Sequence, residues 1–426
     1  MKILALNSGA SSQKSCLYEL SPPFPIDPPA PLWEARMEWG FAGGQAELRI
    51  RNAAGRSRTE TLPIDFHAGP MPSEIRGGQD RTAALERMLG GLWEGPACQI
   101  SGPGEIAAVG HRVVHGGPDF RQPTRVTPEV IAAILHLAEF APLHNRAEVE
   151  GIRLIERVLG NVPQVAVFDT AFHRRMPEAA TVYPGPYAWT EEGIQRYGFH
   201  GINHAYCSWR AAHMLGKEAA SLRLITCHLG NGCSLAAVRG GRSIDTTMGF
   251  TPLDGLMMGS RSGSVDPGIL IHLVRKHGYS AGDLDRILNR ESGLIGLSGV
   301  SRDMREIVAA RQANPRARLA FDVFLHRLRS SIGAMLASLG GLDALVFTAG
   351  IGENSPEVRE GACEPFGFLG LQLDPARNRQ TANGIDRDIA AENSTVRVLV
   401  IGAQEDWAIA RECWNLLHPN QSPAGG

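Results

Sequence analysis

The sequence predicts an α/β fold of two domains, each built on a largely parallel or mixed β-sheet, and three observations support this prediction. The chain has 426 residues, which is more than one hydrophobic core usually supports. A strand, turn, strand pattern occurs over residues 2–20 and again over residues 222–238. Elsewhere strand-like runs alternate with helix-like runs, which favours a central sheet covered by helices in each domain.

The first domain begins with apolar runs at residues 2–6 and 15–20, which predict two strands separated by a turn of small residues. Six prolines lie between residues 21 and 31 and argue against a helix or a central strand there. Alternating apolar and polar residues predict antiparallel strands over residues 32–37, 46–51 and 57–62. We interpret residues 21–66 as an elaboration on the surface of the first domain.

Start and stop signals predict two helices in the second part of this domain. Thr127 is a good N-cap before a proline, and the apolar positions that follow run to Phe140. Asn145, with Glu148 three residues later, predicts the capped start of a second helix, which Gly160 ends.

Helical spacing of apolar residues between Phe321 and Leu339 predicts a long helix, which two glycines then stop. The remaining predicted elements are strands over residues 164–168, 345–348 and 396–401 and a helix over residues 406–417.

The composition favours a cytoplasmic protein with a small-molecule ligand. The net charge is −2, so bulk electrostatics suggest neither nucleic acid nor a membrane surface as a partner. The seven cysteines have no C-x-x-C spacing and are typical of reduced thiols. The first residues form a strand-like run and do not resemble a secretory signal, and no apolar stretch approaches membrane-spanning length.

Three loops rich in glycine follow predicted strands, at residues 7–12, 230–232 and 349–354. Glycine lets backbone N–H groups approach a phosphate closely, and serine and asparagine add further donors. One such loop more often serves a turn, but three together indicate a nucleotide. The G-x-x-x-x-G-K-[ST] motif is absent, which excludes the common P-loop.

Arg112 and Arg261 lie in the runs at residues 110–117 and 257–263, where glycines leave room for a ligand. Arginine matches carboxylate and phosphate oxygens with two parallel donors. A surface or interdomain salt bridge is the alternative for either residue.

Asp169 follows a buried-type strand, where a carboxylate can cap a turn, hold Mg²⁺ through water or pair with an arginine. His200 and His204 are four residues apart and could lie on one helical face. Zinc is disfavoured, since no H-E-x-x-H pattern or nearby thiolate cluster is present.

These residues suit phosphoryl transfer, which needs in-line positioning, cations against the equatorial oxygens and Mg²⁺ held by oxygen ligands. The sequence offers no evident base for a hydroxyl acceptor. A carboxylate acceptor is already ionised, so an acyl-phosphate-forming kinase fits slightly better than a sugar kinase.

On these motifs the chain resembles the acetate kinase family, which includes propionate and butyrate kinases. The matching runs occur in order at residues 7–14, 110–117, 141–145, 167–173, 196–201, 228–232, 248–263 and 348–355. The resemblance implies the fold of sugar kinases, actin and heat-shock ATPases, with two ribonuclease-H-like domains and a cleft between them. The implied domains are residues 1–171, completed by the helix at 406–426, and residues 172–405.

The resemblance also implies reversible transfer of the ATP γ-phosphoryl group to acetate, giving acetyl phosphate and ADP, by a homodimer. Arg112 and Arg261 would hold the acceptor carboxylate and the transferred phosphoryl group, with His200 stabilising that group and Asp169 as the essential acid. The other implied sites are the pocket for the acid's alkyl tail at Val114, Leu143, Phe199 and Pro252, the Mg²⁺ or Mn²⁺ positions at Asn7 and Glu405, and nucleotide contacts at Ser12, Lys14, His228, Asn231, Gly232, Asp303, Met304, Arg305, Gly350, Ile351, Gly352 and Asn354.

Some residues depart from the family pattern. Arg146 replaces a proline, Met304 replaces a phenylalanine, and Ala403-Gln404 precedes Glu405 in place of Thr-Asn. The change at Met304 leaves open the choice of ATP or GTP. The chain length of the acid is also open, because one methylene in an apolar pocket is worth only about 1–3 kcal/mol. The alternatives are a kinase that prefers propionate or butyrate, a phosphatase or other small-acid kinase on the same fold, and a nucleotide-binding regulatory protein that has lost catalysis.

Overall fold

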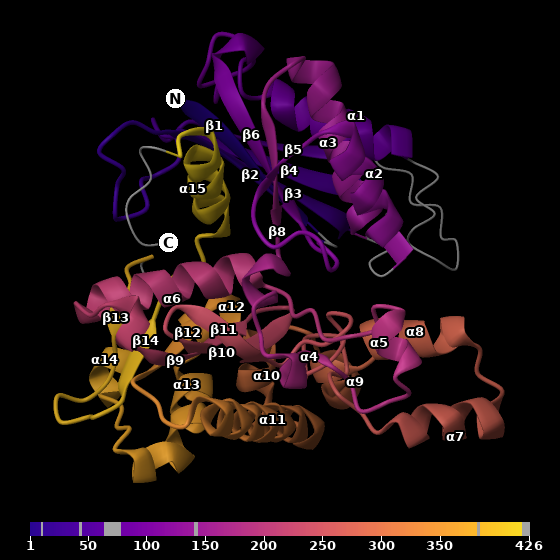
Figure 1. Cartoon of the computed structure of the whole chain (residues 1–426), viewed down its shortest axis with the longest axis vertical. Helices are drawn as coiled ribbons and strands as arrows, with labels where there is room; N and C mark the ends of the chain where they lie inside the picture. Colours follow the sequence, from indigo (N-terminus) through magenta and orange to yellow (C-terminus); the bar gives the residue numbers. More distant parts are fainter. Residues whose placement is uncertain (10–11, 42–44, 64–77, 140–143, 381–383, 420–426) are drawn as a thin grey trace. The chain divides into compact units, whose positions relative to one another are not determined.

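The computed structural model describes residues 1–9, 12–41, 45–63, 78–139, 144–380 and 384–419. The chain forms two compact units, Met1–Ala171 with Gln404–Gly426, and Phe172–Ala403. Each unit has one mixed sheet with helices on it, so the predicted α/β class is confirmed (Figure 1).

The sheet of the first unit has the strand order β5-β4-β3-β2-β1-β6-β8-β7 among the described residues. The central strands β1, β6 and β8 are parallel, and the other pairs in this sheet are antiparallel. The strands are β1 (Lys2–Ser8), β2 (Ser12–Glu19), β3 (Trp33–Phe41), β4 (Gln45–Asn52), β5 (Ser57–Pro63), β6 (Ile106–Val113), β7 (Thr124–Arg125) and β8 (Gln164–Phe168).

Helices cover both faces of this sheet. Figure 1 shows α15 on one face and α1, α2 and α3 on the other, and both layers belong to the first unit. On one side Ile409 and Cys413 of α15 lie so close to Gly110 that a Cβ there would be 2.5 and 2.4 Å from them. The helices are α1 (Gly78–Gly90), α2 (Pro128–His136), α3 (Asn145–Leu159) and α15 (Glu405–Leu417).

Three sequence predictions for this unit need correction. Strand β1 continues to Ser8, so Asn7 pairs with Lys14 and does not lie in a turn. Strands β3 and β4 are not a surface addition, because they extend the main sheet and bury side chains such as Trp33 and Met37 in its core. Helix α2 ends at His136 and a short 3₁₀ turn follows, whereas Phe140 lies outside the described residues.

The sheet of the second unit has the order β11-β10-β9-β12-β14-β13 among the described residues. Strands β9, β12 and β14 are parallel, and β10, β11 and β13 pair antiparallel with their neighbours. The strands are β9 (Arg223–Leu229), β10 (Cys233–Arg239), β11 (Arg242–Thr246), β12 (Ala344–Thr348), β13 (Arg387–Asp388) and β14 (Arg397–Val400).

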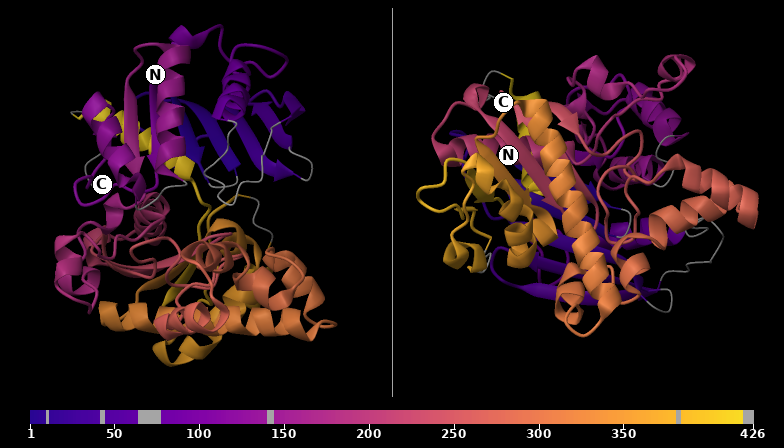
Figure 2. Two further views of the ribbon diagram at one scale, coloured as in Figure 1. Left: turned by 90° about the vertical axis from the view of Figure 1, so that its right-hand side faces the viewer. Right: turned by 90° about the horizontal axis from the view of Figure 1, so that it is seen from below.

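The long helix α11 (Pro315–Leu339) lies across one face of this sheet and α6 (Gly201–Leu215) covers the other (Figures 1 and 2). The apolar residues predicted for the long helix, from Phe321 to Leu339, are indeed buried there. The other helices are α4 (Glu178–Thr181), α5 (Ala188–Glu191), α7 (Pro267–His277), α8 (Ala281–Arg290), α9 (Gly293–Ser298), α10 (Met304–Ala310), α12 (Ala349–Asn354), α13 (Pro356–Cys363) and α14 (Pro375–Arg379). None of the helices within the described ranges has the length and apolar character needed to cross a membrane.

Candidate active site

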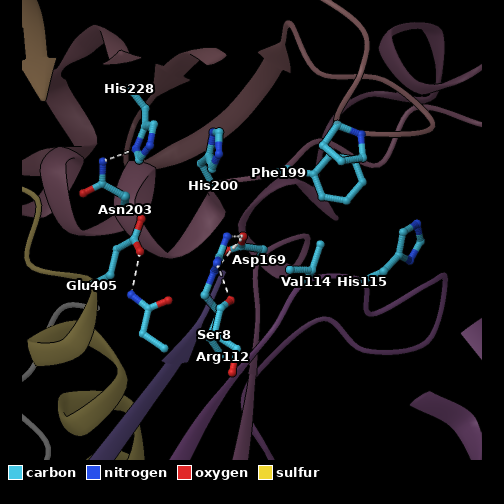
Figure 3. Close-up of polar contacts among 12 residues, drawn as sticks. Ser8, Arg112, Val114, His115, Asp169, Phe199, His200, Asn203, His228 and Glu405 are labelled. Carbon is cyan, nitrogen blue, oxygen red and sulfur yellow. Dashed lines mark hydrogen bonds and ion pairs between the residues drawn. The ribbon is translucent and has the colours of Figure 1, made fainter. Parts of the chain in front are cut away.

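In the first unit, Arg112 at the end of β6 forms a buried ion pair with Asp169, which directly follows β8. Asp169 Oδ2 accepts hydrogen bonds from Nη2 and Nε of Arg112 at 2.5 and 3.1 Å, and Arg112 Nη1 donates to the backbone oxygen of Ser8 at 2.9 Å (Figure 3). These contacts fix the guanidinium plane at the carboxyl end of the parallel strands, where ligands bind in such sheets. Of the three roles open for Asp169, pairing with arginine is the one that the structure shows.

Electrostatics keep this arginine charged although it is buried. Burial disfavours the charged guanidinium, but the negative charges of Asp169 and then Glu405 outweigh this effect and raise the pKa of Arg112 above its usual value.

The two positions predicted for Mg²⁺ lie side by side in this unit. Asn7 Nδ2 donates to Glu405 Oε2 at 2.9 Å (Figure 3). Asn7 comes from β1 and Glu405 is the first residue of α15, so residues 398 positions apart meet there. An amide oxygen and a carboxylate are ligands that Mg²⁺ accepts, and the ion usually keeps several waters. The pair therefore fits a hydrated magnesium ion. No group of three or more His, Cys, Asp or Glu suited to a metal occurs in the part of the chain that the structure describes.

Lys14, which was predicted to contact nucleotide, forms an ion pair with the buried Asp406 of α15. Burial acts against the charge of Lys14, but Asp406 outweighs it and raises the lysine pKa. Ser12 begins β2, and its backbone oxygen accepts a hydrogen bond from Gly9 N at 2.7 Å.

In the second unit, a chain of hydrogen bonds runs through two histidines. Thr226 Oγ1 lies 2.7 Å from His204 Nδ1, and Ser234 Oγ lies 2.8 Å from both His204 Nε2 and His200 Nδ1. Ser234 has one hydroxyl proton, so it donates to one imidazole and accepts from the other. Both ring nitrogens of His204 are thus engaged by hydroxyl groups of the protein, which fits a positioning role and not zinc coordination.

Burial explains why His204 in this chain of hydrogen bonds is neutral. His204 is completely buried, and burial, followed by repulsion from His173 and His228, lowers its pKa well below the usual value.

His200 is held in an unusual backbone conformation at the start of α6. Its φ is 58°, one of two positive values among non-glycine residues in the described chain, and such a conformation costs free energy. The His200 ring stacks on His228 with ring centroids 4.0 Å apart, and His228 Nδ1 lies 2.7 Å from Asn203 Nδ2 (Figure 3). Sequence spacing alone did not identify Asn203, Ser234 or Thr226 as partners.

Arg261 lies near the same histidine. A Cβ added to Gly232 would be 3.3 Å from His200 Nε2 and 3.7 Å from Arg261 Nη1. Arg261 Nη1 also donates to the backbone oxygen of Pro252 at 3.1 Å, which brings a residue predicted for the acid pocket beside the arginine. The loop at Asn231 and Gly232 therefore lies beside two side chains, His200 and Arg261, that could donate hydrogen bonds to a phosphate group.

The other predicted pocket residues are placed separately. Val114 is buried in the first unit, and Phe199 is buried in the second, where its backbone oxygen lies 3.1 Å from His173 Nε2. Leu143 lies outside the described residues.

The predicted nucleotide segments differ from simple loops. Residues 349–354, which include Gly350, Ile351, Gly352 and Asn354, form the short helix α12, with Asn354 Nδ2 donating to Gly350 O at 2.9 Å. Asp303 caps α10 by accepting from Arg305 N and also pairs with the Arg305 guanidinium, while Met304 is buried. The sequence around Asp303 is equally typical of a helix cap and of a nucleotide contact.

Glu148 and Asn145 are polar residues whose positions the sequence reasoning misread. The first residue before α3 is His144, and neither Asn145 nor Glu148 caps the helix. Both are buried and bind the backbone after β6 instead. Glu148 is four residues from the buried Ile152, and this helical spacing was a signal that its carboxyl faces inward.

Comparison with known proteins agrees with this arrangement. The sequence matches the Acetokinase family over residues 2–411. It is 59% identical to a protein named acetate kinase from Gloeobacter violaceus, over 98% of this chain and the whole of that protein.

Solved structures give the same result. The crystal structure of Porphyromonas gingivalis acetate kinase matches with a TM-score of 0.85 and 38% identity, over 98% of this chain and 99% of that one. A propionate kinase from Francisella tularensis matches with a TM-score of 0.79 and 35% identity, over 96% and 98% of the two chains. The resemblance seen in the motifs is confirmed, and the chain belongs to the acetokinase family.

Proposed function

We propose that the protein transfers the γ-phosphoryl group of ATP reversibly to acetate, giving acetyl phosphate and ADP. The observation that carries this proposal is the approach of His200 and Arg261 to the Gly232 backbone, which groups hydrogen-bond donors as a phosphoryl group requires. The names of the relatives, acetate kinase and propionate kinase, support the acceptor class.

In the first unit, Arg112 binds the acceptor. Its guanidinium is held by Asp169 and by the Ser8 backbone, so its orientation is fixed before substrate arrives. An ionised carboxylate attacks without a general base, since it has no proton to lose. Asp169 acts by orienting Arg112 and keeping it charged.

In the second unit, the hydrogen-bond chain sets the proton on His200. When Ser234 donates to His200 Nδ1 and accepts from His204 Nε2, the proton of neutral His200 is on Nε2. That nitrogen is the one near Gly232, and it donates to an equatorial oxygen of the transferred group. Arg261 adds a permanent positive charge at the same place.

Mg²⁺ is the metal that we propose for Asn7 and Glu405, with Mn²⁺ as an alternative of the same ligand preference. When bound with ATP, it neutralises charge on the phosphate oxygens.

Acetate is preferred over propionate as the proposed acceptor because the named relative at 59% identity is an acetate kinase, whereas the propionate kinase is 35% identical. One methylene changes the discrimination by only about 1–3 kcal/mol, so propionate is the second candidate.

An acid panel tests the proposal. The purified protein is incubated with ATP, Mg²⁺ and formate, acetate, propionate or butyrate, and acyl phosphate is trapped with hydroxylamine. We expect the largest kcat/KM with acetate. ATP consumption without trapped product would indicate a phosphatase, and tight ATP binding without turnover would indicate a regulatory protein.

We also propose that the protein forms a homodimer through α7. This helix buries none of its residues, and Ile269, Ile271 and Val274 are 49%, 51% and 46% exposed. An apolar surface of this kind is typical of an interface. Light scattering should give twice the chain mass, and Ile271→Lys should give monomers, whereas the exposed Leu319→Lys on α11 should not.

A further inference from the structure

Glu148 is a buried carboxyl group that the proposed mechanism does not use. It lies in the first turn of α3 and is 3% exposed. Both of its carboxyl oxygens lie 3.2 Å from Val114 N, which donates to them. Asn145 binds the next residue, since its Oδ1 accepts from His115 N at 3.3 Å and its Nδ2 donates to His115 O at 3.1 Å. The first turn of α3 thus fixes the two backbone positions that follow β6.

The backbone positions of Val114 and His115 affect the proposed site because Arg112 lies just before this segment. Arg112 is two residues before Val114 on the same strand and its extension, and Figure 3 shows Arg112, Val114 and His115 along that segment. Val114 is itself a proposed contact of the acid's alkyl tail. A shift of this backbone would therefore move the tail contact relative to the guanidinium.

Glu148 also lines a small cavity of about 20 Å³, partly open to solvent, within the first unit. The polar residues around the cavity are Ser8, Gln13, His111, Arg112 and Glu148, and its other walls are mostly apolar. The volume is enough for about one water molecule. The carboxyl group and the guanidinium therefore line the same small pocket, and because Glu148 is buried, its charge interacts strongly with that of Arg112.

The charged groups that influence Glu148 come from three other parts of the first unit. They are Arg112 of β6, Asp169 after β8 and Arg81 of α1. Burial raises the pKa of Glu148 to about 8, although Arg112 acts in the opposite direction. His111, which lines the same cavity, has its pKa lowered to about 4 by burial and is neutral in this range. Glu148 is thus mostly protonated at pH 6.5 and ionised at pH 9.

We propose that Glu148 is a positioning residue for the acceptor acid, which holds the Val114 backbone and sets how strongly Arg112 attracts a carboxylate. The inference rests on the proposed function. Ionisation of Glu148 adds a further negative charge near Arg112, besides those of Asp169 and Glu405, and weakens the attraction for acetate. Its hydrogen bonds with Val114 N keep the tail contact in place in either protonation state.

Two variants separate these effects. Glu148→Gln keeps an oxygen that accepts from Val114 N but cannot ionise. The ratio of the KM for acetate at pH 9 to that at pH 6.5 should be about fivefold lower in this variant than in the unmodified protein. Glu148→Ala removes the acceptor and should raise the KM for acetate about tenfold at pH 6.5, with a smaller change in kcat. The increase should be smaller at pH 9, because this variant also lacks the negative charge that weakens acetate binding in the unmodified protein. The exposed Glu150→Gln on the same helix is the matched control and should follow the unmodified protein.

The KM for ATP is measured in parallel, and the inference requires that it change little in all three variants. An equal pH ratio in Glu148→Gln and the unmodified protein would overturn the electrostatic role, and a normal KM for acetate in Glu148→Ala would overturn the positioning role. If Glu148→Ala fails to fold, the inference is tested by Glu148→Gln alone, through the ratio of its KM for acetate at pH 9 to that at pH 6.5. Absence of acetate-dependent product in the unmodified protein would instead refute the proposed function, so the two failures are distinguishable.

Discussion

Arg112 and Asp169 form a buried ion pair in which Asp169 Oδ2 lies 2.5 Å from Arg112 Nη2. The pair joins the ends of two parallel strands, β6 and β8, that are adjacent in the sheet. Since Asp169 is buried, the pair has a structural role, besides the role in acceptor binding that we propose for it.

The first prediction concerns this pair. Arg112→Ala should lower kcat by about 10²-fold or more, or roughly 3 kcal/mol, because it removes a positive charge from the transition state. It should also destabilise the protein by about 3–5 kcal/mol, since Asp169 is left buried without its cation. Steady-state kinetics and chemical denaturation measure the two effects. Exposed Arg153→Ala is the control, and normal turnover in Arg112→Ala would assign the pair to structure alone.

Arg261 should differ from Arg112 in stability. It is partly exposed, and its Nη1 donates to the Pro252 backbone. Arg261→Ala should therefore lower kcat by a similar factor of about 10² with less loss of stability. A variant with full activity would contradict the proposed role at the phosphoryl group.

A third prediction tests the hydrogen-bond chain. Ser234→Ala separates His200 from His204, so the His200 ring loses the partner that fixes its orientation and its proton. We expect kcat to fall about 10- to 100-fold while the KM for acetate changes little. Ser221→Ala, at an exposed position, is the control. An unchanged kcat would show that stacking on His228 suffices to orient the ring.

Gly232 should not tolerate a side chain. The Cβ of Gly232→Ala would be 3.3 Å from His200 Nε2, which forces the ring or the loop to move. We expect kcat to fall about tenfold or more, with little change in the unfolding temperature. A small displacement of His200 lowers the rate strongly, but it removes few of the contacts that stabilise the fold. Gly333→Ala in α11, where a Cβ meets nothing within 4 Å, should keep activity and add up to about 1 kcal/mol of stability.

The last prediction concerns stability as a function of pH. The pKa of Glu148 is about 8 in the folded protein, whereas the ordinary pKa of a glutamate side chain is 4.5. Between these values the folded protein holds a proton that the unfolded chain has released, so the free energy of unfolding decreases as pH rises. The decrease from this group is on the order of 4 kcal/mol between pH 4.5 and 8. Denaturation of Glu148→Gln should lack this decrease, and Glu150→Gln should retain it. Parallel pH curves for Glu148→Gln and the unmodified protein would contradict the shift.

Much of the fold could be predicted from local patterns. The strand at residues 164–168 and the end of the long helix at Leu339 lie where they were predicted, because a short apolar run and helical spacing are properties of the local chain. The burial of Trp33 in β3 could not be predicted, because a surface strand and a strand of the main sheet can have the same alternation of apolar and polar residues.

The sequence by itself determined the family, the α/β class and the short motifs that contain Arg112, Asp169, His200 and Arg261. These are encoded in short contiguous motifs. Tertiary structure alone decided which groups act on one another, such as Asn7 on Glu405 or Ser234 on His200. Asn145 and Glu148 were expected at a helix cap, but in the folded chain they form hydrogen bonds with the backbone of His115 and Val114. The physical reason is that a polar side chain binds whichever donor burial brings to it, and sequence spacing does not specify that donor.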